Sequence, residues 1–244
     1  MASSPRPVAV LAGLALALCL PAARGQAILY VDANCPASYP PFDSWANAAT
    51  NIQDAIDYAA DGDTVLVTNG DYYVSSQLDL TVSVTFTSAC GPAVTRIIAV
   101  SNRCLSVAVP ATIDGFSFSN GYFNVAPAHG AGILAVATGV VVRNCHFDNN
   151  WSGARGQGGG LWLGPSGTVE ECVFSNNRAV EGGGAYLNAG GCIFGASFFA
   201  NSAQTNGGGL YADFTNAVVS NCVFSGNSAA DYGGGLQARG MIVD

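Results

Sequence analysis

Acidic and arginine side chains recur through the second half of the chain, and they are the residue types that could support catalysis. Two carboxylates at a suitable separation hydrolyse glycosidic bonds, and a carboxylate cluster can hold calcium. The candidates are Asp148, Glu170, Glu171, Glu181, Asp213 and Asp231, with Arg143, Arg155 and Arg178. They fall at scattered positions of a repeat described below, so the sequence predicts no catalytic pair. Glu170 and Glu171 are interpreted as a solvated bend, and Arg143 with Glu170 as a surface ion pair.

Histidine and cysteine give no metal or nucleophile motif. His129 and His146 are the only histidines, and neither is placed with Ser or Cys in a recognisable triad. No Cys-x-x-Cys occurs, which argues against structural zinc. The cysteines of the repeat (Cys145, Cys172 and Cys222) are predicted to form a buried thiol column, since Cys packs as a small hydrophobe. Those nearer the N-terminus (Cys35, Cys90 and Cys104) are the better disulfide candidates.

Three aromatic residues are candidates for binding a ligand. Trp151 and Tyr232 lie in predicted loops, and Trp162 lies on a predicted strand. Together they could form a ledge for a glycan or a protein; the alternative is ordinary packing. No catalytic or metal-ligating residue is predicted.

The composition excludes several classes of partner. The 244 residues carry 16 acidic side chains and 8 basic ones, all of them arginine, for a net charge of −8. An acidic chain without lysine is unsuited to nucleic acid or to anionic membrane surfaces. Phosphate loops of the Walker type require a lysine and are excluded.

Residues 1–25 are predicted to be a secretory signal peptide. Arg6 precedes an apolar run from Val8 to Leu20, and Ala23-Arg24-Gly25 gives a small-x-small cleavage site before Gln26. The run is too short to cross a bilayer, and no later stretch reaches 18 apolar residues. We therefore expect an exported chain with no membrane-spanning segment after cleavage.

A repeat of about 25 residues organises the rest of the chain. Gly-Gly-Gly begins at Gly158, Gly182, Gly207 and Gly233, with a degenerate copy at Gly130. Phe-x-x-Asn recurs in phase, with the phenylalanines at Phe147, Phe174, Phe198 and Phe224 and the asparagines at Asn150, Asn177, Asn201 and Asn227. Short apolar runs between turn residues, at this period, indicate parallel coils rather than helices or propeller blades.

Stacked coils place equivalent residues directly over one another, about 4.8 Å apart. The phenylalanines should then form one inward column, and the cysteines a second beside it. Val142 and Cys145 have opposite parity, which predicts a bend at Asn144, Glu171 and Asn221, where stacked Asn side chains could hydrogen-bond. The asparagines of Phe-x-x-Asn should do the same at the next corner. The Gly triplets mark a corner where one backbone passes close to the next.

The predicted fold is an all-β, right-handed parallel β-helix with an N-terminal amphipathic capping helix. Residues 26–62 form the cap, with a strand and a helix over 44–60 that Asp43 or Ser44 caps and that buries a stripe from Trp45 to Ala59. Residues 63–129 form irregular first coils and residues 130–244 the regular ones. The chain ends part-way through a coil, so we expect it to be a fragment of a longer protein.

The repeat resembles that of polymorphic outer membrane proteins, which are marked by Gly-Gly-aliphatic and Phe-x-x-Asn motifs. The leader "ILYVDA" and "IQDAIDYAADGDTVLV" is similar to the N-terminal cap of pectin-lyase-like β-helix proteins. This resemblance implies a secreted, cell-surface or outer-membrane location in a bacterium, and adhesion or display without a cofactor. The alternative is a polysaccharide lyase or glycoside hydrolase of the pectin-lyase-like fold, and calcium is expected only in the lyase case.

Overall fold

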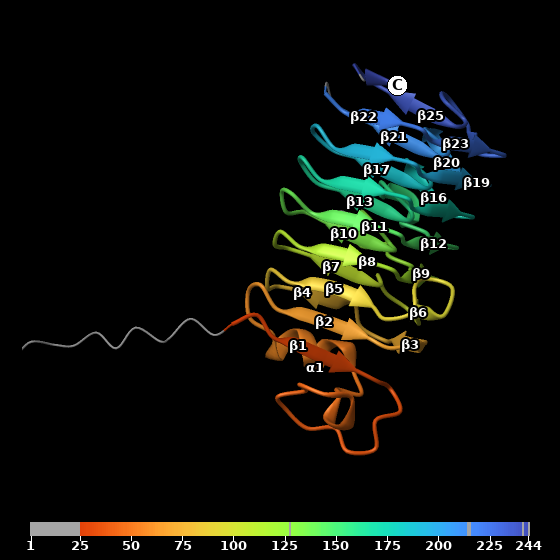
Figure 1. Ribbon diagram of the computed structural model, residues 1–244. Helices are drawn as coiled ribbons and strands as arrows, with labels where there is room; N and C mark the ends of the chain where they lie inside the picture. Colours follow the sequence, from red (N-terminus) through yellow and green to blue (C-terminus); the bar gives the residue numbers. More distant parts are fainter. Residues whose placement is uncertain (1–24, 127, 214–215, 241, 244) are drawn as a thin grey trace, which may run out of the picture.

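The computed structural model describes residues 25–126, 128–213, 216–240 and 242–243. Short strands wind into a stack of parallel coils that rises from the cap at the N-terminal end to the last coil (Figure 1). This confirms the predicted all-β parallel β-helix. The predicted signal peptide lies almost entirely outside the described residues. No helix within them is long and apolar enough to span a membrane.

Each coil contributes one strand to each of three sheets, and later coils add a strand to a fourth. Sheet 1 contains, in spatial order, β1 (Ile28–Val31), β2 (Thr64–Val67), β5 (Thr85–Ser88), β8 (Thr112–Asp114), β11 (Val141–Arg143), β14 (Thr168–Glu170), β18 (Cys192–Phe194), β22 (Val218–Ser220) and β26 (Ile242–Val243). Sheet 2 contains β3 (Gly70–Val74), β6 (Thr95–Ala99), β9 (Ser117–Ser119), β12 (His146–Asp148), β15 (Val173–Ser175), β19 (Ser197–Phe199) and β23 (Val223–Ser225). Sheet 3 contains β4 (Leu78–Leu80), β7 (Leu105–Val107), β10 (Ile133–Ala135), β13 (Leu161–Leu163), β17 (Ala185–Leu187), β21 (Leu210–Ala212) and β25 (Leu236–Ala238). Sheet 4 contains β16 (Arg178–Glu181), β20 (Ser202–Asn206) and β24 (Ser228–Ala229).

The predicted phenylalanine column fills the core behind sheet 2. The rings of Phe147, Phe174, Phe198 and Phe224 stack with centroids 4.7 to 4.8 Å apart and planes 5° to 6° from parallel. Strand register places each phenylalanine opposite the next. The first three side chains are fully buried, as expected when a period-2 strand turns one face to a closed core.

The asparagines of Phe-x-x-Asn form a hydrogen-bonded ladder at the corner that follows sheet 2. The Nδ2 of Asn150 donates to Oδ1 of Asn177 at 2.9 Å, and the same contact continues to Asn201 and Asn227. Each Oδ1 also accepts the backbone N–H of the preceding asparagine at 2.9 to 3.0 Å. The amide side chains therefore satisfy the buried backbone of a corner that no strand ladder reaches.

The Gly triplets form the corner that leads into sheet 3, as the repeat predicts. The first glycine of each triplet has φ between 62° and 64°, in the left-handed region that favours glycine. The second lies against the coil above: a Cβ on Gly183 would lie 2.3 Å from the carbonyl oxygen of Gly208. The bend between sheets 1 and 2 is also left-handed, with φ of 49°, 51° and 53° at Asn144, Glu171 and Asn221. The hydrogen-bonded stack of Asn side chains predicted for that bend is not formed among these three residues.

The cap differs from the single helix predicted over 44–60. It contains a 3-10 turn, η1 (Trp45–Asn47), and a shorter helix, α1 (Ile52–Tyr58), which begins after the N-cap Asn51 rather than Asp43 or Ser44. The interruption arises because Ala49 forms a bridge with Val31 of β1, through backbone hydrogen bonds of 2.9 Å to Tyr30 and Asp32. The predicted apolar stripe is buried except for Trp45, which remains 43% exposed and stacks edge-on against Tyr30. One further 3-10 turn, η2 (Gly153–Arg155), lies in a later loop.

Candidate functional site

An aromatic column runs along the outer face of sheet 3. His129 stacks on Trp162 at 5.7 Å, Trp162 on Tyr186 at 6.3 Å, and Tyr186 on Tyr211 at 5.2 Å. Register places Trp162, Tyr186 and Tyr211 opposite one another, between leucines and alanines that point into the core. Tyr186 and Tyr211 are buried by their neighbours, whereas Trp162 and His129 are only half-buried. The open part of the column is therefore its Trp162 end.

A row of polar side chains lies beside this column, just before the Gly corner. Nε2 of Gln157 donates to Glu181 at 2.9 Å, and Nδ2 of Asn206 donates to the other carboxylate oxygen at 3.2 Å. Bridges join Gln157 to Glu181 and Asn206 to Tyr232 on successive coils. We call Gln157, Glu181, Asn206 and Tyr232 the polar row. Planar amides and a carboxylate beside aromatic rings are groups that can hydrogen-bond and stack on a ligand.

Burial and nearby carboxylates set the protonation of the column. Burial and a hydrogen bond of 2.8 Å to Asp213 raise the pKa of Tyr186 well above its usual value. Burial, followed by the charges of Glu181 and Asp213, raises the pKa of Tyr211. Burial, with a smaller effect of Arg103, lowers the pKa of His129, whose Nδ1 accepts the backbone N–H of Gln157 at 3.3 Å. The column is thus uncharged at neutral pH.

The three predicted binding residues lie in different settings. Trp162 belongs to the aromatic column, and its indole Nε1 is buried without a partner among the described residues. Tyr232 ends the polar row and is 69% exposed. Trp151 packs in a separate stack, 5.0 Å from the Tyr122 ring and with the Arg178 guanidinium 5.3 Å from its own. The structure gives no contact that joins the three into one ledge.

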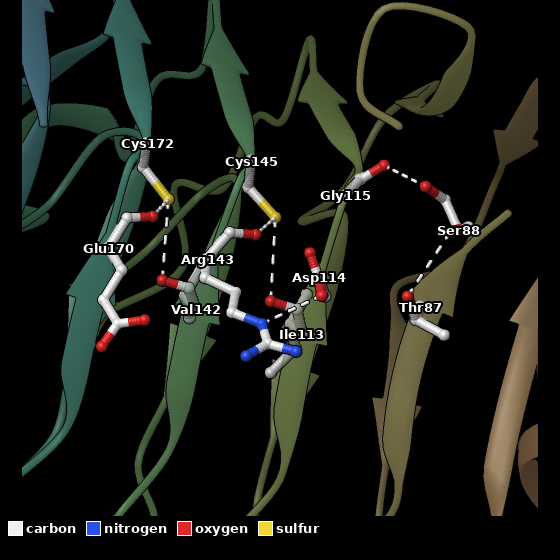
Figure 2. Close-up of polar contacts among 10 residues, drawn as sticks. All are labelled: Thr87, Ser88, Ile113, Asp114, Gly115, Val142, Arg143, Cys145, Glu170 and Cys172. Carbon is white, nitrogen blue, oxygen red and sulfur yellow. Dashed lines mark hydrogen bonds and ion pairs between the residues drawn. The ribbon is translucent and has the colours of Figure 1, made fainter. Parts of the chain in front are cut away.

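Three of the six candidate acids, Asp148, Glu181 and Asp213, are held by side chains of adjoining coils. The carboxylates of Glu170, Glu171 and Asp231 make no hydrogen bond or ion pair with the described residues. Asp148 accepts hydrogen bonds from Ser175 at 2.7 Å and from Asn176 at 3.0 Å. The predicted ion pair between Arg143 and Glu170 is not formed: Arg143 turns to the preceding coil and pairs with Asp114 at 2.9 Å (Figure 2). A neighbouring coil on each side offered a carboxylate, and sequence spacing alone could not choose between them.

The thiol column lies at the same bend. Cys145, Cys172 and Cys222 each direct the thiol to the carbonyl of the residue two before, at 3.1 to 3.3 Å (Figure 2 shows the first two). Burial, with the neighbouring Cys145 thiol, raises the pKa of Cys172. The disulfides proposed among Cys35, Cys90 and Cys104 are not present, and all three are free thiols. Cys35 and Cys104 are instead buried against backbone carbonyls.

His146 lies on the outer face of sheet 2, and burial lowers its pKa. Within the part of the chain that the structure describes, no three His, Cys, Asp or Glu side chains converge as a metal site.

The family comparison matches residues 58–240 to the family described as "Right handed beta helix region". The chain belongs to the right-handed β-helix family. The coils described above are therefore right-handed. Among curated proteins, none matches this sequence significantly.

Two solved structures of pectin methylesterase from Aspergillus niger share the architecture of this β-helix. The first is in a penultimately deglycosylated form, is 13% identical, has a TM-score of 0.52, and is aligned over 90% of this chain and 87% of its own. The deglycosylated form is also 13% identical, has a TM-score of 0.50, and is aligned over 91% of this chain and 82% of its own. At this identity the likeness shows the fold alone.

Sequence reasoning missed one buried cation, Arg103. Its side chain donates to the carbonyls of His129 and Gly130 at 2.7 to 3.2 Å and to Oε1 of Gln77 at 2.7 Å, and it covers the Phe123 ring at 4.1 Å. Burial lowers its pKa to about 10, which leaves it charged at neutral pH. The signal was present: an arginine followed by Cys104-Leu105 at the start of an apolar strand is an unusual place for a charge.

Proposed function

We propose that this β-helix is an exported, non-catalytic module that displays a binding surface at the exterior of a bacterium, for adhesion to a glycan or a protein. The observation that carries the proposal is the aromatic column on the outer face of sheet 3 with the polar row beside it, across the Gly corner. Trp162 offers an accessible aromatic edge, and the polar row offers amide and carboxylate groups at coil spacing. The hydrogen bonds within the row fix these groups in advance, which lowers the entropic cost of binding.

The location is part of the same proposal. The predicted signal peptide and the resemblance to the polymorphic outer membrane protein repeat support export and a cell-surface or outer-membrane position. The acidic surface favours neutral or basic partners over nucleic acid. No cofactor is needed for such a role.

The second candidate is a carbohydrate-active enzyme, and the likeness in fold to pectin methylesterase favours it. Against it stand the contacts of Asp114 and of two of the candidate acids, Glu181 and Asp213. Asp114 is paired with Arg143, Glu181 with two amides, and Asp213 with Tyr186, so these carboxylates serve the stacking of coils.

A single panel of polysaccharides separates the two candidates. The purified protein is incubated with uronic-acid polymers, methyl-esterified and free, with and without calcium, and with neutral glycans; turnover and retention are measured together. We expect retention without turnover, reduced at least tenfold by Trp162→Ala or Tyr232→Ala. Tyr39→Ala is the matched control, because Tyr39 is 58% exposed on the cap, away from sheet 3. Measurable turnover would refute the proposal in favour of the enzyme, and equal retention by all variants would refute the site.

A further inference from the structure

The end of the β-helix at the cap exposes the first strand of each sheet, and such an edge presents unpaired backbone N–H and C=O groups. In sheet 1 the first strand is β1, and the cap covers its outer edge: Tyr30 donates its backbone N–H to Phe42 at 2.7 Å and accepts from Ala49 at 2.9 Å. In sheets 2 and 3 the first strands are β3 and β4, with no further strand beyond them in the described residues. Figure 1 shows β3 at this end of its sheet, beside the cap.

The edge of β4 is satisfied by one side chain of α1. Gln53 accepts the backbone N–H of Asp79 through Oε1 at 2.8 Å, and it donates to the carbonyl of Asp79 through Nε2 at 3.1 Å. A carboxamide has the same donor and acceptor as a peptide group, so Gln53 takes the place of a neighbouring strand. The cap therefore closes two of the three edges.

The edge of β3 has no such partner. Gly70 donates its backbone N–H to Val94 at 2.9 Å, and Val74 accepts from Val100 at 2.9 Å. Because backbone groups of alternate residues point to opposite sides of a strand, Gly70, Tyr72 and Val74 face β6, and Asp71 and Tyr73 face the cap. No hydrogen bond from the described residues reaches the N–H or C=O of Asp71 or Tyr73 on that side.

A cleft of about 510 Å³ opens on this free edge. Its walls are residues 50–53 at the start of α1, residues 71–77 of β3 and the turn that follows, Leu78 at the start of β4, and Ala33. The hydroxyls of Thr50, Ser75 and Ser76 line it without any intramolecular hydrogen bond among the described contacts. This volume lies within the range of about 300–1,000 Å³ typical of ligand sites.

The charge around the cleft is negative. The Asp57 carboxylate accepts a hydrogen bond from Gln53 in the wall at 2.7 Å, and the Asp79 carboxylate accepts one from Gln77 in the wall at 2.8 Å. Asp71 is part of the lining. Two cations lie nearby. Two N–H groups of Arg96 donate to Asp71 at 2.6 Å, and Arg103 donates to Gln77 of the wall at 2.7 Å and to two backbone carbonyls. The Tyr73 ring, 69% exposed on the outer face, can accept a cationic side chain over its face.

We propose that an extended, basic peptide segment of a partner protein adds to β3 as an extra strand in this cleft. The backbone of Asp71 and Tyr73 supplies the hydrogen bonds, and alternate side chains of the peptide contact Tyr73 and the carboxylates. This site shares no residue with the aromatic column or the polar row, and the inference does not depend on the function proposed above.

The test uses a fluorescent, end-blocked hexapeptide of alternating lysine and threonine, and anisotropy as the measure of binding. N-methylation of alternate residues blocks the donors on one edge of the peptide only, so two methylated peptides, one for each edge, serve as matched probes. We expect one of them to bind at least tenfold more weakly than the unmodified peptide and the other to bind as well as it does. A hexapeptide with glutamate in place of lysine should bind at least tenfold more weakly.

Two protein variants test the same edge. Tyr73→Pro removes the free N–H and keeps the hydrogen bonds to β6, because Tyr73 lies opposite Ile98 with its own N–H directed away from β6. We expect the peptide to bind at least tenfold more weakly. Tyr73→Ala keeps the N–H, and its affinity for the peptide should fall only severalfold. If Tyr73→Pro does not fold, as judged by circular dichroism, the methylated peptides decide alone.

Three outcomes would overturn the proposal: no binding of the unmodified peptide, equal binding of both methylated peptides, or equal binding of the glutamate peptide. Analytical ultracentrifugation of the protein without peptide could give a fourth such outcome. A dimer that Tyr73→Pro dissociates would assign the edge to a second copy of this chain.

Discussion

The asparagine ladder gives the sharpest prediction of how these coils are held together. Asn177 is 1% exposed, and its side chain makes four hydrogen bonds. It donates to the Phe147 carbonyl and to Asn201 at 2.9 Å, and it accepts from the backbone and side chain of Asn150 at 3.0 and 2.9 Å. Asn177→Ala removes all four and leaves the buried N–H of Asn150 without an acceptor.

The expected loss follows from these contacts. Four hydrogen bonds at about 1 kcal/mol each give a loss of about 4 kcal/mol in the free energy of unfolding. That is a large part of the roughly 5–15 kcal/mol that stabilises a typical domain. Urea unfolding followed by tryptophan fluorescence measures it, and amide exchange at Asn150 should accelerate by the same free energy if this amide exchanges through global unfolding.

The matched control is Asn176→Gly. Asn176 is adjacent, exposed, and left-handed at φ 55°, a torsion that glycine keeps without strain. Its side chain makes one hydrogen bond, to Asp148 at the surface, so we expect a change below about 0.5 kcal/mol in the free energy of unfolding. A loss below about 1 kcal/mol for Asn177→Ala, or equal losses for both variants, would refute the conclusion that the asparagine ladder stabilises the corner after sheet 2.

Three further predictions follow from the close contacts and buried thiols. Gly183→Ala should lower the free energy of unfolding by more than about 3 kcal/mol, because the added Cβ would lie 2.3 and 2.5 Å from two carbonyl oxygens. Gly191→Ala is the control: its Cβ would lie 3.4 Å from Leu163, and the loss in the same urea assay should be about 1 kcal/mol or less. Burial raises the pKa of Cys104 from 9.0 to about 12, so the thiol ionises at lower pH in the unfolded chain than in the folded protein. Its contribution to stability is therefore complete below pH 9 and is lost as the pH rises towards 12. Cys104→Ala should flatten this part of the plot of unfolding free energy against pH. An aromatic disulfide reagent should label the exposed Cys90 in the native protein, whereas Cys145 and Cys172 should react only after unfolding; rapid native labelling of either would contradict the buried thiol column.

The repeat region was predictable because each of its columns obeys a local rule. A phenylalanine, an asparagine or a glycine recurs where stacking requires the same shape in every coil, so the letters report the geometry directly. The cap was less predictable. Periodicity joined Trp45 to Ala59 in one helix, but pairing of Ala49 with β1 is a tertiary contact that no helical pattern reveals.

The candidate sites were predictable only in part. Trp162 was found as an aromatic residue on a strand, yet its stacking with His129 depends on a loop from the coil before. The free edge of β3 left no trace in residue types, because it consists of backbone groups. The partner of Arg143 was equally hidden, since coils on both sides supply a carboxylate at the same phase.

The difference between inner and outer columns bears on what such a surface can recognise. In the phenylalanine and asparagine columns, each side chain contacts the same residue type in the coil on either side. A substitution in one coil therefore disturbs two contacts, which favours the same residue in every coil. The outward-facing column at the end of the sheet 1 strands does not require one residue type in every coil. Along the stack it contains Thr87, Asp114, Arg143, Glu170, Phe194 and Ser220. A partner lying along the stack meets a different chemistry about every 4.8 Å. Selective recognition of an extended partner is therefore available along the axis of the β-helix.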